Sequence, residues 1–268
     1  MPPSLRTQII RNAHDDIQTA KLEVCPPRVA CAAAFHYLGG MNLKGKFIVI
    51  DGPDGGGKGT QIERLKQFIE QAGGQWVYAK DPGGTVIGDR IRHVLLGYDL
   101  TDMDPHCEAL LFMASRAQLV AEIVRPAVAD GKTAIGDRFI SATCAYQVAA
   151  GFPRDEVVAL GRLAVGETWP DLTIIIDVPP EVGFERTGRD MNQPRRGKKK
   201  NHGDQLSMFA DAHVDAMERR PLDFHRQVRQ NFLALPEFFP APVAIVDGTQ
   251  PPDAVFAAIQ EALERAFP

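Results

Sequence analysis

Short apolar runs alternate with amphipathic stretches from residue 46 to the end of the chain. The apolar runs predict five strands, "KFIVID", "QWVYAK", "TAIGDR", "LTIIIDV" and "PVAIVDG" (46–51, 75–80, 133–138, 172–178 and 242–248). Helical spacing between them predicts helices over 61–74, 106–131, 139–151, 179–188 and 251–267, with 106–131 bent or ended near Pro126. Strands that alternate with helices form βαβ units. We therefore predict an α/β fold of three layers, with a five-stranded parallel sheet between two layers of helices.

Residues 1–40 do not share this alternation. They mix charges, prolines and small residues without sustained periodicity, and Met41 stands just ahead of the first strand. The segment is either a flexible natural extension or the product of an upstream start codon, and we favour Met41 as the true beginning. The remaining residues, 41–268, are then expected to form one domain.

Three of the predicted strands end on polar residues: Asp51, Lys80 with Asp81, and Asp137 with Arg138. Ligands of open parallel sheets bind outside the carboxyl ends of the strands. We therefore expect the functional site at this edge of the sheet.

The segment "GPDGGGKG" follows the first strand directly and precedes a predicted helix, so it fits the GxxxxGK phosphate-binding loop in the structural context that the loop needs. Glycines let backbone N–H groups point at phosphate oxygens, and Lys58 reaches the β- and γ-phosphates. The alternative is a glycine-rich turn that binds nothing. The predicted nucleotide-binding residues are Gly52, Pro53, Asp54, Gly55, Gly56, Gly57, Lys58, Gly59 and Thr60.

Gly59 stands where this loop usually has the hydroxyl that binds Mg²⁺, and Thr60 places a hydroxyl one residue later. Asp54 is a second candidate metal ligand, with turn formation as its alternative role. The metal site is therefore expected to differ from the usual one, while the phosphate cradle is complete.

Composition limits the other possibilities. The 268 residues carry a net charge of −4, which argues against a nucleic-acid partner, and no apolar run approaches the ~18 residues that span a bilayer. The four cysteines, Cys25, Cys31, Cys107 and Cys144, have no metal-ligand spacing and are expected to be thiols in a reducing compartment. We expect a soluble, cytoplasmic protein without a membrane partner.

Beyond the phosphate loop, a series of motifs resembles the thymidylate kinase family from about residue 46 to the C-terminus. These are "DGPDGGGKGTQ", "KDPGGTVIGDRIR", "LLFMASRAQL", "GDRFISATCAYQ", "PDLTIIIDVPPEVGFER" and "DAMERRPLDFHRQVRQNFL". Each motif alone is modest, but their order is specific. The resemblance implies a P-loop kinase that phosphorylates dTMP with ATP and Mg²⁺ for dTTP synthesis. It also implies a homodimer and a mobile lid at about 186–216.

The resemblance also implies roles for single residues. Asp81 begins the motif that lies along the acceptor nucleotide, and Arg92 matches an arginine that holds the acceptor phosphate. Phe112 matches the residue that stacks on thymine, and Arg116 one that contacts the base edge; a core phenylalanine and a solvated arginine are the structural alternatives.

The motif "DRFISATCAYQ" supplies the remaining predicted site residues. Asp137 matches a carboxylate that serves the metal or the acceptor, and Arg138 an arginine that holds phosphate, with a structural ion pair as the alternative. Thr143 matches a base contact, and Tyr146 and Gln147 match the family's acceptor-binding "AYQ", with Tyr146 against the sugar. Ordinary helix packing is the alternative for these three.

Several positions depart from the family pattern. Lys80 and Ala142 replace a common arginine and serine, Ala216 removes an arginine, and Gly55 leaves the phosphate loop without one. Family members of this kind take catalytic cations from the lid, so we expect Arg186, Arg189 or both to act in catalysis.

Two other functions stay open. One is a kinase for another nucleoside monophosphate (AMP, UMP/CMP or dUMP), and the other is a nucleotide-binding regulator with weakened catalysis.

Overall fold

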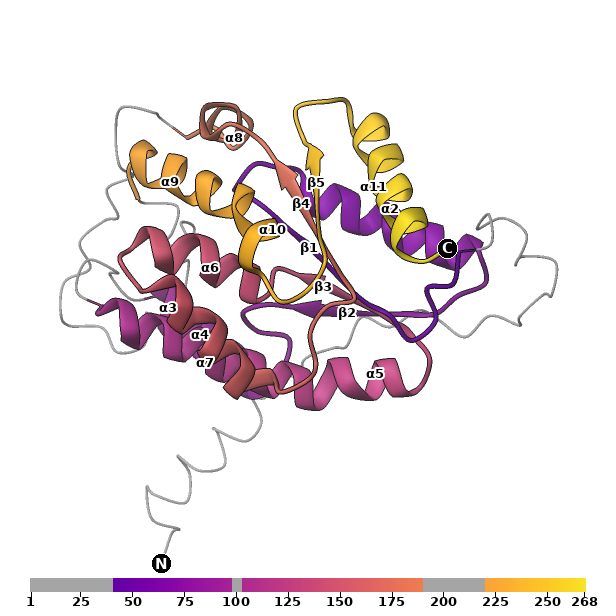
Figure 1. Cartoon of the computed structure of the whole chain (residues 1–268), viewed down its shortest axis with the longest axis horizontal. Coiled ribbons are helices and arrows are strands. Elements are labelled where there is room, and N and C mark those ends of the chain that lie inside the picture. The colour runs from indigo at the N-terminus through magenta and orange to yellow at the C-terminus, as the bar shows by residue number, and fades with distance from the viewer. Residues whose placement is uncertain (1–40, 98–102, 190–219) are drawn as a thin grey trace, which may run out of the picture.

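The computed structural model describes residues 41–97, 103–189 and 220–268. All five predicted strands are present: β1 (Phe47–Asp51), β2 (Trp76–Lys80), β3 (Thr133–Asp137), β4 (Leu172–Asp177) and β5 (Val243–Asp247). They form one parallel sheet in the order β2-β3-β1-β4-β5 (Figure 1). Residues 1–40 and most of the expected lid, with Ala216, lie outside the described residues.

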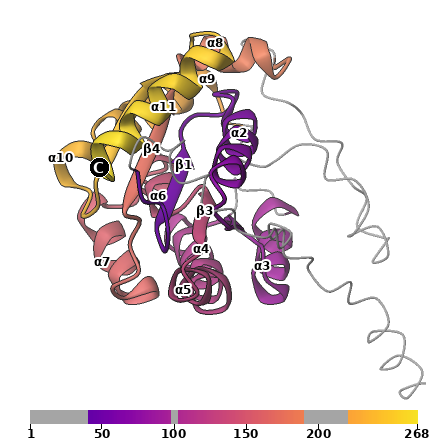
Figure 2. The same cartoon turned by 90° about the vertical axis from the view of Figure 1, so that its right-hand side faces the viewer.

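Alternate side chains of the strands enter two separate hydrophobic cores. In β1, Phe47 and Val49 join one core, whereas Ile48 and Ile50 join the other, as the pleat of a strand requires. The second core is closed by α2 (Lys58–Gln71) and α11 (Pro252–Ala266), which lie together on one side of the sheet in Figure 2. This arrangement confirms the predicted three-layer α/β fold.

The opposite face of the sheet carries most of the other helices: α4 (Pro105–Leu119), α5 (Arg125–Ala129), α6 (Ile140–Ala149), α7 (Arg154–Val165) and α9 (Leu222–Leu233). The helices α3 (Val86–Gly97), α8 (Pro180–Arg186) and the short α10 (Leu235–Phe238) complete the described fold. Phe112 of α4, Phe139 just before α6, Tyr146 of α6 and Phe232 of α9 are buried in this core.

Helices α3, α7 and α9 were not predicted from periodicity. The buried positions of α9 are His225, Val228, Asn231 and Phe232, and two of these four are polar. In α7 one of the buried positions is a glycine, Gly161, and a larger side chain there would contact Ile140 and Trp169. An apolar pattern is therefore weak in helices whose buried faces carry polar or very small residues.

The predicted interruption of the helix near Pro126 takes a specific form. Helix α4 continues through a π-helical turn, Val120–Val124, into α5, and Pro126 lies at the start of α5. Because proline has no N–H to donate, the helical hydrogen-bond pattern changes just before it. The chain stays helical, so the segment is altered but not ended.

Candidate functional site

The parallel register of β1, β2 and β3 places the carboxyl ends of these strands side by side. Ile50 pairs with Asp137 between β1 and β3, and Lys80 pairs with Asp137 between β2 and β3. Asp51 and Arg138 therefore come to the same edge of the sheet, as expected from their positions after apolar runs. The phosphate loop, residues 52–57, follows β1 at this edge and leads into α2.

The phosphate loop has the backbone that an anion cradle requires. Gly52, Gly55 and Gly57 have φ values of 133°, 74° and 86°, which favour glycine strongly. The Lys58 Nζ atom donates to the carbonyl oxygens of Gly52 and Pro53 at 3.0 and 2.9 Å, so the ammonium lies over the loop. Helix α2 begins at Lys58, and its N-terminus adds positive electrostatic potential next to the phosphate loop.

Helix α8 packs directly on the backbone of this loop. A Cβ atom on Gly55 would lie within 3.0 Å of the Gly183 backbone, and one on Gly183 would overlap the carbonyl oxygen of Asp54. Two glycines are therefore needed where the two segments meet. This contact explains why position 55 carries no arginine: no side chain fits between the loop and α8.

Arg138 connects the phosphate loop to the rest of the site. Its Nη1 atom donates to Asp51 Oδ1 and to the carbonyl oxygen of Gly52, both at 3.1 Å. Its Nη2 atom donates to Asp54 Oδ1 at 2.5 Å and to the hydroxyl of Tyr146 at 3.4 Å. Arg138 also has φ 67°, a conformation that non-glycine residues seldom adopt and that occurs often at functional sites.

The charges at this edge shift two pKa values. Burial opposes ionisation of Asp54, but the positive charges of Arg138 and Lys58, followed by weaker ones, outweigh it and lower the pKa of this carboxyl. Burial, supported by the positive charge of Arg138, lowers the pKa of Lys58 to about 8. A bound polyphosphate would bring negative charge next to Lys58 and favour its charged form.

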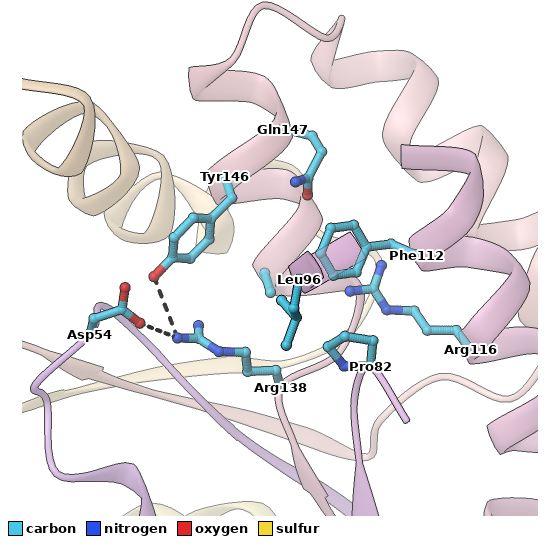
Figure 3. A pocket seen from close by; sticks show the side chains of 9 residues that line it. Asp54, Pro82, Leu96, Phe112, Arg116, Arg138, Tyr146 and Gln147 are labelled. Carbon is cyan, nitrogen blue, oxygen red and sulfur yellow. Dashed lines mark hydrogen bonds and ion pairs between the residues drawn. The ribbon is translucent and has the colours of Figure 1, made fainter. Parts of the chain in front are cut away.

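A pocket extends from Arg138 along the face of α6, and Figure 3 shows its lining. One end is charged, with Asp54 and Arg138, and the other has apolar walls from Pro82, Leu96, Phe112 and Ala142. The described residues that line it are Asp54, Pro82, Leu96, Phe112, Arg116, Arg138, Ala142, Tyr146 and Gln147. A phosphate at the charged end would leave the apolar end for a flat, apolar group.

Arg116 is held rigidly at the apolar end. Its Nε donates to Asp81 Oδ2 at 2.6 Å, its Nη1 donates to Thr143 Oγ1 at 2.6 Å, and its guanidinium lies over the Phe112 ring. Arg116 and Asp81 are almost completely buried, and burial raises the pKa of Asp81 against the effect of Arg116. The alternative of a solvated arginine is wrong, because Arg116 is 1% exposed.

Arg92 of α3 lies near the same wall. Its Nη1 donates to the carbonyl oxygen of Pro82 at 2.9 Å, which places the guanidinium beside the "DPGGT" turn. The Ser115 hydroxyl accepts a hydrogen bond from the N–H of Gly83 and ties this turn to α4. The predicted acceptor residues Asp81, Arg92, Phe112, Arg116, Thr143, Tyr146 and Gln147 thus surround the pocket or its rim.

The two arginines at the predicted start of the lid have different environments. Arg186 donates to the carbonyl oxygens of Gly248 and Gly55 at 2.9 and 3.4 Å. Arg189 lies over the Phe184 ring, contacts His225 Nε2 at 3.1 Å and places Nη1 3.8 Å from Asp54 Oδ2. Arg189 therefore faces the phosphate loop, whereas Arg186 connects that loop to the turn after β5.

The candidate metal ligands are dispersed. Asp54 is paired with Arg138, Asp137 Oδ2 accepts from the Tyr78 hydroxyl at 2.7 Å, and Thr60 is exposed on the first turn of α2. Within the described residues no three His, Cys, Asp or Glu side chains form a metal-binding group. Mg²⁺ commonly binds through one or two carboxylates together with substrate phosphates, and the carboxylates here fit that mode.

Sequence reasoning assigned no role to two neighbours of these residues. Asp51 is completely buried, and its Oδ2 accepts from the Ser141 hydroxyl at 2.6 Å while Oδ1 accepts from Arg138. Tyr78 of β2 holds Asp137. Asp51 could have been found from the sequence, because it is the polar residue at the end of an apolar strand. Tyr78 could not, because its contact with Asp137 depends on the pairing of β2 with β3.

A phosphate-binding loop at the carboxyl edge of a parallel sheet, connected by an arginine to a second pocket, defines a nucleotide-binding protein of the P-loop class. The model of the thymidylate kinase family matches residues 50–259. The chain belongs to this family of phosphotransferases.

Several curated relatives support this membership. The chain is 35% identical to a thymidylate kinase of Clostridium novyi over 81% of its own length and 97% of the relative's. It is 38% identical to one of Desulfosudis oleivorans (82% and 96% covered) and 36% identical to one of Geobacter sulfurreducens (84% and 99% covered). In the part of the chain that the structure describes, no helix is long and apolar enough to cross a membrane.

Proposed function

We propose that this protein transfers the γ-phosphoryl group of ATP to the 5′-phosphate of dTMP and releases dTDP and ADP. The observation that carries the proposal is the position of Arg138, which contacts the phosphate loop through Gly52 and Asp54 and also lines the second pocket. Its guanidinium is therefore within reach of both phosphate groups. The relatives named thymidylate kinase support the choice of dTMP.

Catalysis in this proposal needs no protein nucleophile, because the acceptor phosphate is already anionic. The loop N–H groups and Lys58 hold the donor phosphates, Arg138 lies between donor and acceptor, and Arg189 adds charge from the lid side. These fixed charges stabilise the transition state electrostatically. Mg²⁺ would be held by Asp54, Thr60 or Asp137 together with phosphate oxygens, and it supplies further neutralisation of phosphate charge.

In the acceptor pocket, Phe112 is proposed to stack on the base, and Tyr146, whose ring lies against the Arg138 guanidinium, is proposed to contact the sugar. Arg116 is fixed by Asp81 and Thr143, so its donors keep one orientation toward the pocket. Arg92 is proposed to bind the acceptor phosphate from the rim of the "DPGGT" turn.

An acceptor series tests this function. Purified protein with ATP and Mg²⁺ receives dTMP, dUMP, UMP, CMP or AMP, and ADP formation is measured. We expect the highest kcat/KM with dTMP. The absence of ADP above the background without acceptor would refute the kinase, and a preference for AMP would favour another nucleoside monophosphate kinase.

The affinity for ATP is expected to depend on pH through Lys58. A bound polyphosphate raises the pKa of Lys58 from its value of about 8, so binding takes up a proton above pH 8. The dissociation constant of ATP should therefore rise about tenfold per pH unit from pH 8.5 to 9.5. Below about pH 7.5 Lys58 is already protonated in the free protein, so its titration should no longer change this constant. Titration calorimetry from about pH 7 to 9.5 measures this dissociation constant. Lys58→Arg stays charged and should lack the rise; equal profiles for both proteins would contradict the assignment.

We also propose that the protein forms a homodimer through α3 and α4. These helices lie side by side, and Ile87 and Val94, one heptad apart on α3, are exposed together with Leu110 of α4. A second copy would remove this apolar surface from water. Light scattering after size exclusion should give the mass of two chains, and Val94→Glu should reduce it to one; a monomer in the unsubstituted protein would contradict the dimer.

A further inference from the structure

Gln147, which lines the pocket, has a buried partner that sequence reasoning did not identify. The Gln147 Nε2 atom donates to Glu108 Oε1 of α4 at 2.6 Å. Both residues are 1% exposed. Glu108 itself is not one of the residues that line the pocket, whereas Gln147 is, so Gln147 lies between Glu108 and a ligand.

The chemistry of this contact fixes how the carboxamide of Gln147 is turned. An ionised carboxylate only accepts hydrogen bonds, so it must face the NH₂ group and not the carbonyl oxygen. Arg220 Nη2 forms an ion pair with Glu108 Oε2 at 3.7 Å. The remaining carbonyl oxygen of Gln147 is directed toward Phe112 in Figure 3, at the apolar end of the pocket.

We propose that Glu108 is a specificity-determining positioning residue, which orients Gln147 so that its carbonyl oxygen accepts a hydrogen bond from the base. The favoured bases are 2,4-dioxopyrimidines, which carry hydrogen on ring N3. This inference rests on the proposed function, because that function places the base at Phe112.

The disfavoured bases are 4-aminopyrimidines such as cytosine. Ring N3 of cytosine is an acceptor and would face the acceptor oxygen of Gln147, which leaves both without a donor in a buried site. Turning the carboxamide over would instead bring its oxygen against the Glu108 carboxylate. A site built for a hydrogen bond rejects a ligand that cannot complete it.

The test is a ratio of two substrates in the variant Glu108→Gln. A glutamine at 108 can donate as well as accept, so Gln147 is free to turn over. We expect kcat/KM to fall for dTMP and to be kept or raised for dCMP, so that the dTMP/dCMP ratio decreases about tenfold or more. A purely structural defect would lower both values together, and an unchanged ratio would overturn the proposal.

Two further variants complete the experiment. Glu122→Gln makes the same chemical change at an exposed position of the same helical run and should keep both rates and the ratio. If Glu108→Gln does not fold, Gln147→Leu, which removes the carboxamide, should lower the ratio by a similar factor; a retained ratio would overturn the proposal.

A double variant shows whether Glu108 acts through Gln147. Adding Glu108→Gln to Gln147→Leu should change the ratio no further, and a second independent decrease would contradict positioning. Failure of the unsubstituted protein to phosphorylate dTMP would count against the proposed function, whereas an unchanged ratio in active variants counts against Glu108 alone.

Discussion

Replacement of Lys58 by alanine is expected to lower kcat for ADP formation with dTMP about a thousandfold or more. The ammonium lies over the phosphate loop and is the charge best placed to hold the γ-phosphate during transfer. The fold should persist, because the lost contacts are two hydrogen bonds to loop carbonyls at a partly exposed position. Initial rates and far-UV circular dichroism measure the two effects.

Lys44→Ala is the matched control for this change. Lys44 is exposed before β1, at the opposite end of the strand from the phosphate loop. Its replacement should leave kcat within about twofold, as is usual for surface changes away from a site. A Lys58→Ala protein with near-normal kcat would show that the loop does not bind the transferred phosphate.

The variant Gly183→Ala is expected to reduce the free energy of unfolding by about 2 kcal/mol or more, a shift of roughly 5 °C in Tm. Its Cβ atom would overlap the carbonyl oxygen of Asp54, so the loop or α8 must move. Since α8 carries Arg186, which contacts Gly55 and Gly248, the KM for ATP should rise as well. Thermal unfolding and ATP saturation curves give both values.

Gly59→Ala makes the same substitution in the first turn of α2, where a Cβ atom meets nothing within 4 Å. Its φ is outside the left-handed region, so alanine should keep or raise stability, by up to about 1 kcal/mol. Equal Tm values for the two variants would mean that the contact between α8 and the loop is loose enough to adapt.

Local patterns were sufficient for the strands and the phosphate loop. Each strand is a short apolar run, and the run before Gly52 places the loop at a strand end without any knowledge of the other strands. The parallel pairing of the five strands follows from the βαβ alternation as a class, whereas their order, β2-β3-β1-β4-β5, comes only from the structure. The family resemblance added the positions around the acceptor pocket, and their individual roles stay proposals.

Contacts between distant segments could not be predicted in this way. Arg116 is enclosed by Asp81 and Thr143, which are 35 and 27 residues away along the chain. The partner of Gln147 is 39 residues away, on another helix. The signal for α9 was weak because His225 and Asn231 occupy its buried face, where they contact Arg189 and the backbone of α6.

The sequence by itself determined that Lys58 follows a glycine-rich loop after a buried strand, because glycine conformations and apolar runs are local properties. Only the tertiary structure decided which charges face that loop. Arg138 and Arg189 form ion pairs with Asp54. Arg186 is only three residues from Arg189 in the sequence, yet it donates hydrogen bonds to backbone carbonyl oxygens instead. The reason is physical: a side chain's partners depend on how α8 and α9 pack on the sheet, and no local pattern encodes that packing.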